Sequence, residues 1–191
     1  MKITGRTPLR GVALIVGRAL AHHGIRAILT GGACASIHSE GAYLSEDIDF
    51  ILQGRVLPAE LDAAMAAVGF ARQANRYLHP SSRFWVEFPR GPLAVGADLN
   101  VVPIALEGSV AGTLALSPTD SCRDRLAAFY HWNDRQSLEV AVQIASRHEI
   151  DLDLVRRWSA GEGHSARYEE FRRELSPKDP DPQPKRRARR A

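Results

Sequence analysis

The sequence predicts an α+β fold, in which a small mixed β-sheet is flanked by helices and followed by a C-terminal helical segment. Short apolar runs bounded by glycine or proline, which are typical of strands, occur at residues 26–30, 45–52 and 70–95. From Ser117 to about Arg147 the apolar residues recur with helical spacing instead. At 191 residues the chain is long enough for one domain with a real core, but hardly for two independent domains.

The first elements are a helix, a strand and a short helix. Thr7-Pro8 is expected to cap a helix with Pro8 at its first position, and Gly24 is expected to end it. The apolar run at residues 26–30 predicts a strand that stops at a turn formed by Gly31-Gly32. A short helix is expected over residues 33–39.

The next elements are predicted to build the sheet. Residues 45–52 alternate polar and apolar side chains, which favours a strand with one face on the core and the other facing a cleft. Residues 58–68 begin with Pro58 and end before Gly69, which predicts a helix. Residues 70–95 are expected to add two or three strands.

The remainder of the chain is predicted to be mainly helical. A strand is expected over residues 113–116, a helical region from Ser117 to about Arg147, and further helices over 152–160 and 164–175. This places a core at residues 1–116 and a helical segment at 117–175. Residues 176–191 are rich in proline and charge, so we expect this tail to be disordered.

The excess of positive charge in the chain lies in that tail. Residues 176–191 hold six Lys or Arg and two Asp, which leaves 19 basic and 20 acidic residues in the first 175. The cluster Lys185 to Arg190 either binds RNA phosphates or acts as a solvated tail. Cys34 and Cys122 have no paired spacing, and no apolar run approaches the length of a membrane span. We therefore expect a cytoplasmic protein without membrane insertion.

Two aspartates and two glycines form the pattern that carries chemistry. Residues two apart on a strand point to the same side, so Asp47 and Asp49 would present two carboxylates to one cleft. Magnesium is typically held by one or two carboxylates together with substrate phosphates. Gly31-Gly32 would let backbone N–H groups approach a phosphate closely. Each feature alone is common in solvated strands or ordinary turns, but the combination favours a metal and nucleotide site.

These residues resemble a known family. Thr30-Gly31-Gly32 followed by residues 44–50 (LSEDIDF) is similar to the nucleotidyltransferase core of the DNA polymerase beta superfamily, closest to AbiEii-like toxins and related minimal nucleotidyltransferases. Looser similarity extends over Ser117–Asp120, Asp124–Leu126 and His131–Arg135.

The resemblance implies a role for particular residues. Asp47 and Asp49 would bind magnesium as two ions in the family's manner, and a third carboxylate would complete the catalytic site as a further metal ligand. That carboxylate is either Glu87 or Asp98, and we prefer Glu87 because Asp98 follows Gly96 and suits a turn. The NTP site would be formed by the residues Gly31, Gly32, Ser45, Arg125 and Asp134.

The sequence also departs from the family. Ala33 stands where a Ser or Thr hydroxyl usually contacts a phosphate, Ser36 lies one turn further on, and Arg125 replaces the usual lysine. The expected activity is magnesium-dependent transfer of NMP from an NTP to a hydroxyl of tRNA, a protein or a small molecule. The alternative is a catalytically weak nucleotide-binding module, or a toxin–antitoxin component with an antitoxin as partner.

Overall fold

The computed structural model describes residues 2–109 and 112–176 and confirms the predicted α+β class. Within these residues one mixed sheet has the strand order β3-β4-β5-β2-β1-β7-β6. Its strands are β1 (Ala27–Thr30), β2 (Asp47–Leu52), β3 (Ala71–Gln73), β4 (Arg76–Leu78), β5 (Trp85–Glu87), β6 (Ile104–Ala105) and β7 (Leu114–Ala115). The tail that we expect to be disordered lies, apart from Ser176, outside the residues that the structure describes.

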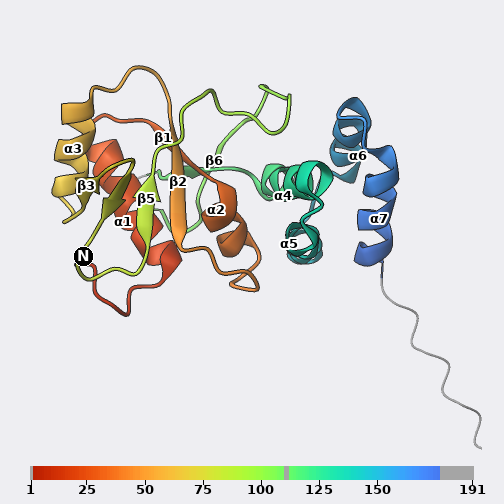
Figure 1. Ribbon diagram of the computed structural model, residues 1–191, viewed down its shortest axis with the longest axis horizontal. Helices are drawn as coiled ribbons and strands as arrows, with labels where there is room; N and C mark the ends of the chain where they lie inside the picture. Colours follow the sequence, from red (N-terminus) through yellow and green to blue (C-terminus); the bar gives the residue numbers. More distant parts are fainter. Residues whose placement is uncertain (1, 110–111, 177–191) are drawn as a thin grey trace, which may run out of the picture.

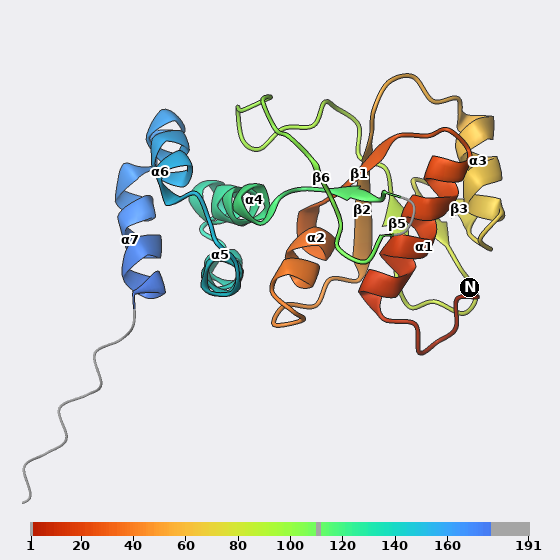
Figure 2. The ribbon, with the colours of Figure 1, turned by 180° about the vertical axis from the view of Figure 1, so that it is seen from behind.

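Helices precede, interrupt and follow the sheet. They are α1 (Leu9–His22), α2 (Gly31–His38), α3 (Pro58–Ala66), α4 (Pro118–Trp132), α5 (Arg135–Arg147), α6 (Leu152–Gly161) and α7 (Ser165–Leu175). In Figure 1, α1 and α3 lie on one side of β1 and β2 and α2 lies on the other, with α4 to α7 beyond α2. The reverse view in Figure 2 shows the same order. None of the helices in the described ranges is long and apolar enough to cross a membrane.

Two local expectations need correction. Helix α1 begins at Leu9 with Pro8 as its N-cap, because the Thr7 hydroxyl instead accepts a bond from the Thr4 amide in a preceding turn. Helix α2 begins at Gly31, so the two glycines form its first turn and do not precede it. The predicted helical region from Ser117 to about Arg147 is confirmed and consists of two helices, because Asn133 adopts a left-handed conformation (φ 54°) that ends α4.

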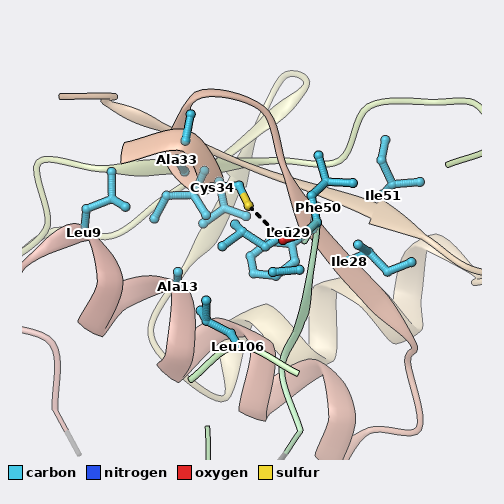
Figure 3. Close-up of a cluster of buried hydrophobic side chains, with 14 of the residues drawn as sticks. Leu9, Ala13, Ile28, Leu29, Ala33, Cys34, Phe50, Ile51 and Leu106 are labelled. Carbon is cyan, nitrogen blue, oxygen red and sulfur yellow. Dashed lines mark hydrogen bonds between the residues drawn. The ribbon is translucent and has the colours of Figure 1, made fainter. Parts of the chain in front are cut away.

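The central strands have one apolar and one polar face. Ile48 and Phe50 of β2 are fully buried with Leu29 of β1 and Val86 of β5. Figure 3 shows part of the same buried cluster, to which α1 contributes Leu9 and Ala13 and α2 contributes Ala33 and Cys34. The alternate positions of β2 carry Asp47 and Asp49, which are only partly buried. The core therefore lies under α1 and α3 and continues between α2, α4 and α5, while the first turn of α2 covers the aspartates.

A buried arginine joins the loop after β5 to the helical segment. The side chain of Arg123 on α4 is 1% exposed and donates to Asp98 (2.5 Å) and to Asp120 (2.8 Å). Its guanidinium carbon lies 5.1 Å from the ring centroid of Trp158 on α6, and the Trp158 indole N–H donates to the Val95 carbonyl at 3.1 Å. This cluster fixes the 95–98 segment against α4 and α6.

Candidate functional site

Three carboxylates meet on the polar face of the sheet. Strand β2 is parallel to β5, with Asp47 opposite Trp85 and Asp49 opposite Glu87. Partner residues on paired strands point to the same face, so Glu87 lies on the side of the sheet that carries Asp47 and Asp49. The pairing of strands that are far apart in sequence therefore brings Glu87 beside the aspartate pair.

The first turn of α2 packs directly on Asp49. Thr30 is opposite Asp49 in the antiparallel β1–β2 pair, and α2 begins at the next residue, Gly31. Gly31 has a φ of +62°, and a Cβ at this position would lie 2.5 Å from Oδ2 of Asp49. A helix N-terminus carries backbone N–H groups without helical partners, and within the described residues the Thr30 side chain does not cap this one. The arrangement joins a carboxylate and the N-terminus of a helix at one point.

Ser45 and Trp85 orient the other two carboxylates. The Ser45 hydroxyl is buried and donates to Oδ1 of Asp47, and a Cβ on Gly32 would lie 2.6 Å from the Ser45 oxygen. The indole N–H of Trp85 donates to Oε1 of Glu87 at 3.0 Å. Gly32 therefore leaves the space that Ser45 fills.

The environment of Asp49 disfavours its ionised form. Burial is the main cause, the charges of Asp47, Glu87 and Asp124 add to it, and the Arg125 guanidinium acts in the opposite direction. Together they raise the pKa of Asp49 from 3.8 to about 7. The site therefore has an excess of negative charge that a bound cation would relieve.

This pKa predicts a pH dependence of stability. Between pH 3.8 and about 7 the folded state holds the proton on Asp49 and the unfolded state does not. The free energy of unfolding should therefore fall as pH rises through this range. Asp49→Asn removes that loss, so the variant should match the wild type near pH 4 and exceed it above pH 7 by about 1–3 kcal/mol. Urea unfolding of both proteins across this range measures the difference, and equal stability at every pH would contradict the prediction.

A second prediction concerns Gly31. Gly31→Ala adds left-handed backbone strain and displaces Asp49, so it should lower the free energy of unfolding by more than about 1–2 kcal/mol and weaken the NTP binding that the family resemblance implies. Gly24→Ala is the matched control, because Gly24 has a φ of +71° and, in the described part of the chain, its added Cβ would meet no atom within 4 Å. Calorimetry of NTP binding and thermal unfolding test the pair. Equal effects of the two variants on nucleotide binding would show that contact with Asp49 is unimportant.

Arg125 lies at the edge of this site, held by its neighbour. Its Nη2 and Nε donate to Oδ2 of Asp124 at 2.6 and 3.1 Å, and its side chain is 16% exposed. Helix α4, which carries both residues, packs on α2. The pair places one guanidinium and a fourth carboxylate within electrostatic range of Asp49.

The remaining predicted residues have other contacts. Asp98 accepts hydrogen bonds from the Arg123 side chain and from the Asn100 amide. These bonds and the Arg123 charge hold the pKa of Asp98 below its usual range. Asp134 is the N-cap of α5 and accepts bonds from the amides of Gln136 (3.0 Å) and Ser137 (3.3 Å). Asp134 thus has a structural role, and the structure brings Glu87, but not Asp98, next to the aspartate pair.

The two departures on α2 have simple structural explanations. Ala33 is fully buried in the core. Ser36 is also buried, and its hydroxyl donates to the Tyr43 carbonyl at 2.6 Å. Ser36 is therefore not available as a replacement for a hydroxyl at position 33, and phosphate contacts at this helix would come from backbone N–H groups.

The donor set fits a hard divalent cation that shares its ligands with a substrate. In the ranges that the structure describes, no three His, Cys, Asp or Glu side chains already form a metal-binding group. Ser45 and Trp85 instead hold oxygens of Asp47 and Glu87. Magnesium prefers carboxylate and phosphate oxygens and needs only one or two protein carboxylates. Asp47 and Asp49 satisfy that requirement when phosphates supply further ligands.

Comparison of the chain with models of known protein families, with curated proteins and with solved structures gives no match in any of the three. A functional assignment therefore depends on the residues of the site. Sequence reasoning did not select Asp124 or Trp85 for it. The position of Trp85, two residues before Glu87 on a predicted strand, was the signal that could have found it.

Proposed function

We propose that the protein is a metal-dependent nucleotidyltransferase that transfers NMP from an NTP to a hydroxyl and releases pyrophosphate. The observation that carries the proposal is the contact of Asp49 with Gly31 at the start of α2, in register with Glu87 on β5. A triphosphate seated on the first turn of α2 would lie beside the carboxylates that hold its magnesium. The resemblance to the polymerase beta superfamily supports the same activity.

Each residue has a separate part in this reaction. Asp47 and Asp49 would hold magnesium, which when bound neutralises phosphate charge and polarises the reacting oxygens. The backbone of Gly31 and Gly32 would bind phosphate oxygens, and Arg125 would exchange Asp124 for a phosphate. Glu87, oriented by the Trp85 indole, would accept the proton of the attacking hydroxyl. The products are a nucleotidylated acceptor and pyrophosphate.

The buried Ala33 and the engaged Ser36 favour one alternative. With neither hydroxyl facing the phosphates, the protein would bind nucleotide weakly and act as a sensor or as a toxin–antitoxin component. Nucleotide binding without turnover on any acceptor would support this alternative.

Two measurements test the proposal. Calorimetry with each NTP should show binding that requires magnesium and is lost in Asp47→Asn. Incubation with labelled NTP and an extract containing RNA and protein should then release pyrophosphate and label one class of macromolecule. The proposal fails if NTP binds equally well without a divalent cation, or if no labelling or pyrophosphate release occurs.

A further inference from the structure

The polar face of the sheet continues beyond the carboxylates onto β5 and β4. Trp85 is opposite Asp47, and Arg76 of β4 is opposite Glu87 in an antiparallel pair. All of these side chains therefore point to the same face. The guanidinium carbon of Arg76 lies 5.3 Å from the centroid of the Trp85 ring, which makes a cation–π pair directly beside Glu87.

Solvent reaches this part of the face. Arg76 and Gln73, which share it, are exposed, and Trp85 is partly exposed. The alternate residues Tyr77 and Val86 are buried on the opposite face. The Trp85–Arg76 pair is therefore an accessible surface and not part of the apolar core.

The pair has the chemistry of a stacking surface for nucleic-acid bases. The hydrogen bond to Glu87 fixes the edge of the indole, and the Arg76 guanidinium lies over the ring, so the pair offers an aromatic plane and a guanidinium plane together. Within the described ranges Arg76 forms no ion pair with a carboxylate, and neither does the exposed Arg83 before β5. Bases of single-stranded RNA stack on aromatic rings and on arginine planes, and free guanidinium groups bind phosphates.

We propose that Trp85 and Arg76 form the platform on which the 3′-terminal base of a single-stranded RNA acceptor stacks. The inference depends on the proposed transferase function and names its acceptor. A base held on Trp85 brings the terminal ribose beside Glu87, the carboxylate that would take the hydroxyl proton. The five basic residues between Lys185 and Arg190 supply phosphate-binding charge in the same chain. A protein acceptor would make less use of an accessible pair of an indole and a guanidinium plane.

Binding of a short 5′-fluorescein-labelled single-stranded RNA to the full chain tests the platform. Stacking contributes about 1–3 kcal/mol per base, so Trp85→Leu should weaken binding by about 5- to 150-fold. Trp85→Phe should keep most of the affinity because it keeps a ring, and Arg76→Met should lose part of it. Trp132→Leu and Arg55→Met are matched controls, because Trp132 is 79% exposed at the end of α4 and Arg55 is exposed in the loop after β2. Both controls should bind like the wild type.

A second RNA localises the effect to the terminal base. Removing only the 3′-terminal base should weaken binding to the wild type as much as Trp85→Leu does, and it should have no further effect on that variant. Thermal unfolding of each variant shows whether it is folded, and the partial loss of binding expected for Arg76→Met serves as the test if Trp85→Leu is not, because Arg76 is exposed. If Trp85→Leu and removal of the 3′-terminal base weaken binding additively, the proposal is wrong.

The outcomes separate this inference from the proposed function. If NTP binding and pyrophosphate release persist while RNA binding is absent or insensitive to Trp85, the inference is wrong and a protein or small-molecule acceptor is favoured. If RNA binding depends on Trp85 but no NTP is bound or turned over, the transferase function fails and the RNA platform stands. Loss of RNA binding in the Trp132→Leu control as well would place the RNA elsewhere and contradict the inference.

Discussion

The Asp47→Asn and Asp49→Asn proteins should fold normally and release pyrophosphate more than about 100-fold more slowly than the wild type. Loss of even an outer partner of a metal ligand typically costs about 10- to 100-fold, and these changes remove carboxylates expected to be ligands. Asparagine keeps the shape of the side chain, and at position 47 its Oδ1 still accepts the Ser45 hydroxyl. The defect should therefore lie in metal-dependent binding and transfer, not in folding.

A second Asp-x-Asp pattern in the chain supplies the control. Asp151 caps α6 and Asp153 lies in its first turn with a side chain that is 76% exposed. Asp153→Asn should leave magnesium-dependent NTP binding and pyrophosphate release unchanged. Wild-type activity in both the Asp47 and Asp49 variants would exclude the proposed catalytic site.

Glu87→Gln and Asp98→Asn should fail in different ways. Glu87→Gln keeps an acceptor for the Trp85 indole but cannot take a proton, so turnover should fall by about 10²- to 10⁴-fold while NTP binding persists. Asp98→Asn should keep near-normal turnover, yet it removes one anion from a buried guanidinium. We expect a loss of about 1–3 kcal/mol in the free energy of unfolding.

Turnover, calorimetric NTP binding and urea unfolding of the two proteins distinguish these effects. Wild-type turnover in Glu87→Gln together with a severe loss in Asp98→Asn would move the third carboxylate to Asp98. Equal stability of Asp98→Asn and the wild type would show that the pair with Arg123 contributes little.

The side-chain directions within one strand could be predicted from the sequence, whereas the pairing between strands could not. The alternation at residues 45–52 predicted that Asp47 and Asp49 share a face, because side-chain direction in a strand depends only on the strand. Whether Glu87 or Asp98 lies next to them depends on the pairing of β5 with β2 and on Arg123, which is 25 residues beyond Asp98. Such choices are made by contacts between distant segments.

The missed boundaries have similar causes. Helical periodicity continues across Asn133, so only the left-handed backbone at that residue reveals two helices. Strand β6 has only two residues, both exposed and directly after Pro103, so it is too short to give an alternating pattern, and it exists because β7 pairs with it. The start of α2 at Gly31 was missed because glycine usually ends helices.

The Arg123 cluster should make the sheet and the helical segment unfold cooperatively. Its two anions belong to different segments, Asp98 to the loop after β5 and Asp120 to α4, and the cation also contacts Trp158 on α6. Separating the sheet from the helices would break both the Arg123–Asp98 ion pair and the Trp158–Val95 hydrogen bond. The sheet and the helical segment should therefore melt together in one cooperative calorimetric transition, and protease cleavage after Leu116 should not yield a sheet that survives alone.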